Sequence, residues 1–305
     1  MVIAPFITSE GTGTPYVTIE EVLFSPTASG IDFTNLIENA SDAVQRRALQ
    51  EVIVRASAKA DNFTMGALGT LSATQSTENG RFRPNRDGNI IIHPEFWPIL
   101  EVVSFSAGTL PGQGQQTITL STNNCFIERH QFIVTAATGL GSQTSIGSLD
   151  MVGGSYNFRQ ENYCTYQYVN GFANAFFSTE ATVGTTTLVV SNPLGMYAGQ
   201  TLTIWDGMND ENVTIQSISG STLTITAGTN FTHAKGVNIS ALPATVKQAV
   251  IHFCVAMIKQ RGQGGLVINE IGEAQQYSTR DVNGQADEAQ GYDLLDDFRQ
   301  IWGRN

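Results

Sequence analysis

Charged residues are scarce in this 305-residue chain, and basic residues are the scarcer kind. Asp, Glu, Lys and Arg make up 14% of the sequence, against about 25% in a typical soluble domain. The formal net charge is −11, from 16 basic and 27 acidic residues. A protein that grips nucleic acid needs a basic surface, so this balance argues against an ordinary nucleic-acid binder. It remains compatible with a ring or tunnel through which DNA slides without adhering, because like charges repel.

Cysteines are also few, and a long apolar run is missing. Cys125, Cys164 and Cys254 are an odd number without CxxC spacing, which indicates reduced thiols in an intracellular product. The best apolar stretch is interrupted by Lys247 and His252, and it falls short of the ~18 residues of a membrane span. The N-terminal residues contain no basic region, so we expect no secretory signal.

Motifs for catalysis or metal binding are missing as well. The chain has no HExxH, no histidine–cysteine zinc spacing, no GxSxG, no P-loop and no GxGxxG after a predicted strand. His252 is expected to be a hydrogen-bonded histidine at the edge of a helical core. Asp206, Asp210 and Glu211 lie close together but lack EF-hand spacing, so a hairpin loop is expected there. We therefore expect no enzymatic activity, no metal and no cofactor.

Three helices are predicted from apolar side chains that recur at steps of three and four. The clearest is Leu242–Gly262, in which Pro243 suits the first turn and the terminal glycine ends the helix. The second covers Ser41–Phe63 and carries a charged face, which is either solvated or a contact between subunits. The third covers about Ala286–Trp302. Thr18 and Glu21 fit a capping box before a strand or a first helical turn.

The rest of the chain reads as short strands. Residues 180–240 contain five segments that alternate apolar residues with Thr or Ser, separated by glycines, which is typical of a small all-β barrel or sandwich. A second strand block covers about residues 70–136, with a turn at Asp87–Gly88, and YCTYQYV from Tyr163 adds a further strand. Polar, glycine-rich residues 138–155 are expected to form a long loop.

We therefore predict an α+β protein with a small helical core of about three helices, a β-hairpin or strand block, and an inserted all-β module, barrel-like or sandwich-like. The predicted organisation is an N-terminal arm (1–15), a discontinuous core (16–178 and 241–305) with a long loop or β insertion around 106–162, and the β module (180–240).

Six stretches resemble, in their order along the chain, the head–tail adaptor (connector) proteins of long-tailed bacteriophages. They are YVTIEEV, ALQEVIVRASAKADNFTMG, FRPNRDGNIIIHPEFWPILEVVSFSAG, YQYVNGF, LPATVKQAVIHFCVAMIKQRG and GYDLLDDFRQIWGR. The likeness covers about residues 16–105, 163–177 and 241–305. Segments 106–162 and 180–240 are additions, because members of that family are usually shorter.

The resemblance implies a structural virion protein that assembles into a homo-oligomeric ring, a dodecamer, beneath the portal protein. Such a ring extends the DNA channel, lets DNA pass without specific binding, and docks the next stopper or tail-completion protein. The implied location is the head–tail junction, after assembly in the host cytoplasm, with no membrane contact.

The resemblance also assigns the C-terminal helix to the portal side. The candidate portal contacts are Leu294, Leu295, Phe298, Ile301, Trp302 and Arg304. The candidate ring or channel contacts are the basic residues of the second helix and of the 81–86 stretch: Arg46, Arg47, Arg55, Lys59, Arg81, Arg83 and Arg86. The arginines of 81–86 can equally be solvated side chains of a loop, or a contact to phosphate or another acidic surface.

A glycan-binding or adhesion protein is the alternative function. Its working part would be the 180–240 module, in which Tyr197, Trp205 and Phe231 could stack on sugar rings. The same aromatic residues could instead belong to the core of the module.

Overall fold

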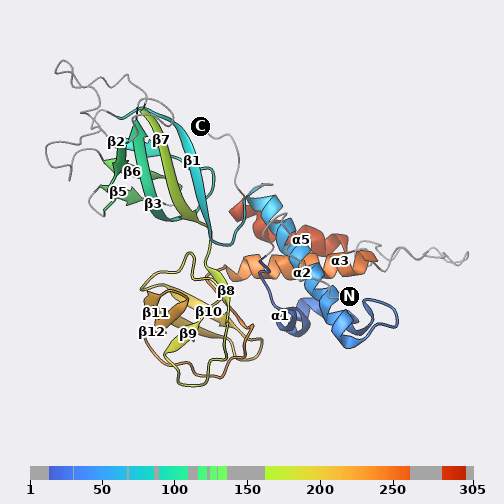
Figure 1. Ribbon diagram of the computed structural model, residues 1–305. Coiled ribbons are helices and arrows are strands. Elements are labelled where there is room, and N and C mark those ends of the chain that lie inside the picture. Colours follow the sequence, from blue (N-terminus) through green and yellow to red (C-terminus); the bar gives the residue numbers. More distant parts are fainter. Residues whose placement is uncertain are drawn as a thin grey trace, which may run out of the picture. The chain divides into compact units, whose positions relative to one another are not determined.

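The computed structural model describes residues 14–29, 31–66, 69–85, 89–108, 116–121, 124–128, 130–135, 162–261 and 284–299. Helices and antiparallel sheets are both present (Figure 1), so the predicted α+β class is confirmed. The chain divides into two compact units, Met1–Ser72 together with Ala173–Asn305, and Ala73–Phe172.

The helical part of the first unit contains four described helices, which come from distant parts of the chain. The helices are α1 (Ile19–Phe24), α2 (Asp42–Thr64), α3 (Ala244–Arg261) and α5 (Gln285–Leu295), with the 3-10 turns η1 (Pro26–Ala28), η2 (Phe33–Asn35) and η5 (Asp296–Phe298). Figure 1 shows α2, α3 and α5 packed beside one another. Their apolar stripes are buried, as Ile53 and Phe253 illustrate with no exposed surface. The predicted helices of residues 41–63 and 242–262 are confirmed.

The capping box at the start of the helical part agrees with the prediction, whereas the last helix does not have its predicted length. The capping box is present, because Thr18 Oγ1 accepts from the Glu21 N–H and the Glu21 carboxylate accepts from the Thr18 N–H. The last helix is shorter than predicted: α5 ends at Leu295, one 3-10 turn follows, and Arg299 is already extended. Asp296 and Asp297 stand at this helix end, where the dipole disfavours negative charge.

The β module of the first unit is a six-stranded antiparallel sheet that curls on itself. Its strands are β8 (Asn174–Phe176), β9 (Thr187–Val189), β10 (Thr201–Trp205), β11 (Glu211–Ser219), β12 (Thr222–Ile225) and β13 (Asn238–Ser240). The order is β8-β13-β10-β11-β12-β9. All five predicted segments form strands, and their alternate apolar side chains, such as Leu202 and Ile204, fill one core.

The division into units differs from the predicted one. The β module begins earlier than residue 180, because β8 pairs with β13, and a bridge between Phe177 and Val190 joins the two edges of the sheet. The module also shares one compact unit with the helices, whereas the strand block of residues 73–172 stands as the second unit. A buried polar junction around Lys247, described below, connects the module to the helices.

The second unit consists of two small antiparallel sheets. The strands are β1 (Thr74–Phe82), β2 (Asn89–Ile92), β3 (Ile99–Gly108), β4 (Gln116–Ile118), β5 (Cys125–Ile127), β6 (Phe132–Thr135) and β7 (Asn162–Asn170). The sheets have the orders β1-β7-β3-β4 and β2-β6-β5, and side chains of both, among them Phe105 and Phe132, share one core. Three strands therefore lie within the predicted 106–162 insertion, while residues 138–155 and the Asp87–Gly88 turn lie outside the described residues.

Candidate functional site

The outer face of α2 carries the exposed arginines that the sequence singled out. Arg46 lies 3.0 Å from Glu20 of α1, and Glu51 lies between Arg47 and Arg55 at 3.9 and 3.8 Å. Exposed ion pairs of this kind contribute only about 0–1 kcal/mol. These side chains can therefore exchange partners at little cost when an acidic surface approaches.

Lys59, the fourth basic residue predicted on this helix, is engaged inside the subunit. Its Nζ lies 2.6 Å from Glu288 Oε1 of α5, and it stands 5.1 Å and 5.4 Å from the ring centroids of Phe253 and Tyr292. The hydrogen bond from Lys59 lowers the pKa of Glu288, although partial burial acts in the opposite direction. Lys59 thus ties α2 to α5 and α3 and offers less charge to a neighbour than the three arginines.

The predicted portal contacts of the C-terminal helix separate into core and surface positions. Leu295 is fully buried and belongs to the core, so it is not available to a partner. Leu294 and Phe298 are half-buried and remain reachable. Ile301, Trp302 and Arg304 lie outside the described residues.

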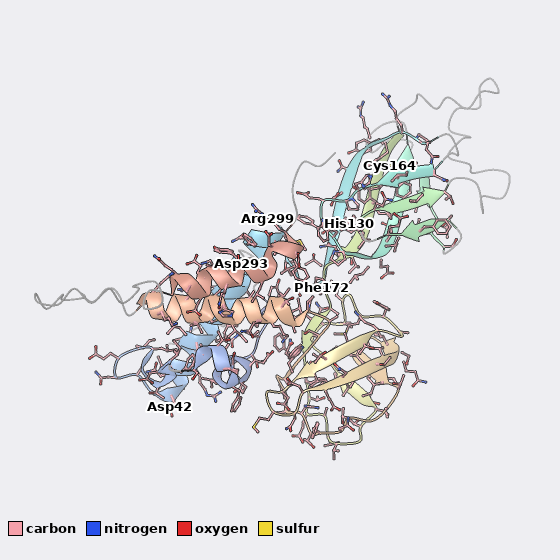
Figure 2. The ribbon with its side chains drawn as sticks, turned by 180° about the vertical axis from the view of Figure 1, so that it is seen from behind. Asp42, His130, Cys164, Phe172, Asp293 and Arg299 are labelled. Atoms are coloured by element: carbon pink, nitrogen blue, oxygen red, sulfur yellow. The ribbon has the colours of Figure 1, made fainter. Side chains whose placement is uncertain are left out.

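The C-terminal helix is held tightly against the bundle. Gly291 lies directly against the Phe253 ring, and the rings of Phe63 and Tyr292 are 4.7 Å apart. Arg299, labelled with Asp293 in Figure 2, stands 5.3 Å from the Phe63 ring centroid. A partner that binds this helix therefore meets a fixed surface.

In the second unit, two of the predicted arginines lie on or just after strand β1, which also carries a carboxylate that binds two tyrosines. Arg81 and Arg83 are exposed, and Arg86 lies outside the described residues. Further along β1, Glu78 accepts hydrogen bonds from the hydroxyls of Tyr166, at 2.8 Å, and Tyr168.

This cluster of Glu78, Tyr166 and Tyr168 stabilises the sheet. Burial is the main cause that raises the pKa of both tyrosines. The hydrogen bond to Glu78 and the negative charge of Glu78 raise it further. Both hydroxyls thus remain donors, and the carboxylate is held by β7 and by the Glu95 N–H. This cluster was not predicted from the sequence, although tyrosines two residues apart in a strand face the same side.

Lys247 forms the buried junction between the helices and the β module. Its ammonium donates to Glu21 Oε1 at 2.6 Å and to Asn238 Oδ1 at 2.9 Å, and it lies 4.5 Å from the centroid of the Trp205 ring. Asn238 in turn donates to Asn174 of β8. Burial lowers the pKa of Lys247 to about 8, although the charge of Glu21 acts in the opposite direction. The only signal in the sequence is a lysine within the most apolar helix.

His233 is a second buried polar side chain that was not predicted from the sequence. It has no exposed surface, its Nδ1 lies 2.8 Å from Asp206 Oδ2, and its Nε2 lies 2.6 Å from Glu211 Oε1. Both ring nitrogens can donate only as imidazolium. The predicted hairpin loop at 206–211 is confirmed as the β10–β11 connection, and its carboxylates hold the segment around His233 in place. With both nitrogens engaged, the ring is a fixed structural element rather than a base or a metal ligand.

The three aromatic residues of the alternative function occupy different environments. Trp205 packs under Lys247, and its buried Nε1 has no hydrogen-bond partner among the described residues. Tyr197 and Phe231 are 54% and 42% exposed. Of the three rings, those of Tyr197 and Phe231 are therefore the more accessible to a ligand.

The placement of His252 expected from the sequence is confirmed, and Cys254 of the same helix belongs to the core. His252 lies at the edge of the helical core, 3.3 Å from Asp287 Oδ1. Cys254 is fully buried on the apolar face of α3, and burial raises the pKa of its thiol.

The described residues contain neither a metal centre nor a helix that could span a membrane. No group of three or more His, Cys, Asp or Glu side chains in the described ranges could hold a metal ion. Among the helices of those same ranges, none is long and apolar enough to cross a bilayer. Comparisons with protein-family models, curated proteins and solved structures found no match. The surfaces of the chain and the sequence resemblance are therefore the two guides to its function.

Proposed function

We propose that this protein is a structural adaptor of a bacteriophage neck. It forms a homo-oligomeric ring beneath the portal, extends the channel through which DNA leaves the head, and docks the next stopper or tail-completion protein. The chain acts as a scaffold without catalysis, and its place is the head–tail junction of the virion.

The observation that supports this proposal best is the packing of α2, α3 and α5 as one bundle. These helices come from three of the stretches that carry the resemblance, and two β assemblies separate α2 from α3 and α5 in the chain. A rigid bundle with a charged outer face suits a subunit that repeats around an axis, because a heterologous ring contact needs two different fixed surfaces on each copy.

The charge of the chain agrees with this role. The net charge of −11 disfavours binding of the DNA backbone. A genome that must leave the head through the channel benefits from a wall to which it does not adhere. The exposed arginines of α2 are few and interleaved with Glu20 and Glu51, so they suit a contact between proteins better than a track for phosphates.

Immunogold labelling of intact virions tests the proposed location. Antibodies raised against the isolated, purified protein should label a single zone between head and tail, and labelling should increase in particles whose tails have been removed. Label on the capsid faces would contradict the proposal. Label at the tips of fibres would favour an adhesion protein.

Glycan binding is retained as a second candidate because Tyr197 and Phe231 are exposed on the β module. Stacking on sugar rings needs such aromatic faces, whereas Trp205 is covered by Lys247. A glycan array probed with the full chain separates the candidates: binding lost in a Tyr197→Ala, Phe231→Ala variant supports adhesion, and an array without signal leaves the adaptor proposal.

A further inference from the structure

Two connections of the chain join the second unit to the first, one at Ser72–Ala73 and the other at Phe172–Ala173. The connections run side by side, because the Ala73 N–H donates at 2.7 Å to the carbonyl of Phe172, which is labelled in Figure 2. On the first unit, the Ala173 carbonyl accepts from the Ala241 N–H at 2.8 Å. One short segment of the first unit can therefore contact both connections.

Pro15 and Tyr16, which we call the clasp, form that segment. On the outgoing connection, the Tyr16 hydroxyl accepts from the Ser72 N–H at 3.1 Å and lies 2.7 Å from Thr70 Oγ1. On the returning connection, the Pro15 carbonyl accepts from Asn174 Nδ2 at 3.2 Å. Two consecutive residues thus hold the first-unit ends of both connections.

Asp61, in the last turn of α2, anchors the clasp to the helical bundle. Its Oδ1 accepts from the Tyr16 hydroxyl and, at 2.8 Å, from the Leu71 N–H. The Tyr16 N–H also donates to Ser57 Oγ of the same helix at 3.1 Å. Because Tyr16 and Leu71 have no exposed surface, bulk water does not compete for these hydrogen bonds.

Asp61 is a largely buried carboxylate that no cation of the described ranges neutralises. The groups that face it are the Tyr16 and Thr70 hydroxyls and the Leu71 N–H. Of these, Tyr16 titrates, but burial and then the charge of Asp61 raise its pKa well above the ordinary value, so it stays protonated. Burial raises the pKa of Asp61 to about 6, although the hydrogen bonds that it accepts act in the opposite direction.

We infer that the clasp is a proton-dependent lock on the two connections to the second unit, and that protonation of Asp61 tightens it. In an opened clasp Asp61 would meet water, and its pKa would return toward the ordinary 3.8. The closed clasp therefore binds the proton more tightly than the open one, so closure is favoured at low pH and weakens as the pH rises through about 6. A protonated carboxyl group still accepts hydrogen bonds through its carbonyl oxygen. This inference does not depend on the adaptor proposal.

Hydrogen exchange of the full chain tests the inference. The protection factors of the Leu71 and Ser72 amides, which correct for the intrinsic effect of pH on exchange, report opening of the clasp. We expect them to fall about tenfold from pH 5 to pH 8 in the wild type. Asp61→Asn keeps the shape of the side chain without its charge and should abolish the fall, whereas Asp42→Asn, at an exposed position of the same helix, should retain it. Protection that is constant or rises with pH, or an equal fall in Asp61→Asn, overturns the inference.

A second variant tests the clasp itself at a single pH. Tyr16→Phe removes the hydroxyl that joins Asp61 to Ser72, and the protection of the Ser72 amide should drop by about tenfold or more. Tyr197→Phe removes an exposed hydroxyl and should leave that protection unchanged. Circular dichroism establishes that each variant is folded. Wild-type protection of Ser72 in Tyr16→Phe would show that Tyr16 does not hold the outgoing connection.

Discussion

At Gly291 the helical bundle leaves no room for a side chain. A Cβ atom there would lie 2.4 Å from the Phe253 ring, and that ring is fully buried. Glycine normally weakens a helix by up to about 1 kcal/mol relative to alanine, so close packing is the reason for its presence. Gly291→Ala should lower the free energy of unfolding by about 1–3 kcal/mol, because an overpacked core must shift.

Urea denaturation measures this effect. Gln290→Ala is the matched control, since it changes an exposed residue of the same helix and should alter stability by less than about 0.5 kcal/mol. An unchanged or increased stability in Gly291→Ala would mean that α5 does not pack on α3 as described.

Because of Lys247, the free energy of unfolding depends on pH in the alkaline range. The unfolded chain keeps this ammonium protonated up to about pH 10.5, whereas burial lowers the pKa in the folded protein to about 8. Between these values the unfolded state binds more protons, so the contribution of Lys247 to the free energy of unfolding rises with pH. Relative to Lys247→Met, the wild type should gain on the order of 2 kcal/mol from pH 8 to pH 10.

Thermal unfolding at a series of pH values checks this prediction. Lys235→Met removes an exposed lysine from the same module and should follow the wild type at every pH. Parallel curves for the wild type and Lys247→Met would show that Lys247 is not buried in the folded protein. At pH 7 the Met variant should already be less stable, because Glu21 loses its partner in a buried site.

At the scale of elements, the β10–β11 hairpin and the segment that follows β12 are joined by the histidine–carboxylate contacts. Burial raises the pKa of Glu211, but hydrogen bonds from His233 and Asn230 outweigh it, so the pKa lies below the ordinary 4.5. This contribution to stability is present above about pH 4.5 and is lost as the pH falls through the lower folded-state value.

Glu211→Gln should therefore cost about 1–3 kcal/mol at pH 7, because the buried His233 loses a charged acceptor. The loss should shrink as the solution is acidified below pH 4.5. Glu180→Gln, an exposed substitution in the same module, is the control and should be neutral. A loss that stays constant down to acidic pH would contradict the ion pair.

The elements themselves were largely predictable from the sequence, whereas their pairing was not. Apolar residues at steps of three and four predict α2 and α3, and the alternation of apolar with polar residues predicts the five strands of the 180–240 module. Each pattern reflects a local geometry of the backbone. Strand β8 escaped prediction, since three residues hold too little pattern and their pairing with β13 is fixed only by the closed sheet. The partners of His233 and Lys247 lie up to 226 residues away, so no local signal marks them.

The residues predicted to contact the portal or a neighbouring subunit could likewise be assigned only in part from the sequence. The sequence identified the arginines of α2 as exposed, and the structure places three of them at the surface. It could not show that Lys59 is used by Glu288 or that Leu295 is core, because both depend on α5 docking against α2 and α3. The proposed ring depends on contacts between copies, which one chain does not contain.

At the scale of the whole molecule, the charged face of α2 is proposed to meet a neighbouring subunit. Arg46→Glu with Arg47→Glu should weaken ring formation, because two attractive charges at the contact become repulsive. Lys235→Glu reverses an exposed charge on the β module and should leave assembly unchanged. The mass distribution at moderate salt measures the outcome, and normal rings in the double variant would exclude this face from the contact.

The mass and symmetry of the purified protein, alone and with its portal protein, test the central claim most directly. Native mass spectrometry with negative-stain imaging should find a closed ring, or a single chain that becomes a ring only on the portal. Either result supports the adaptor function. A stable single chain that ignores the portal would contradict it and would direct attention to ligands of the β module.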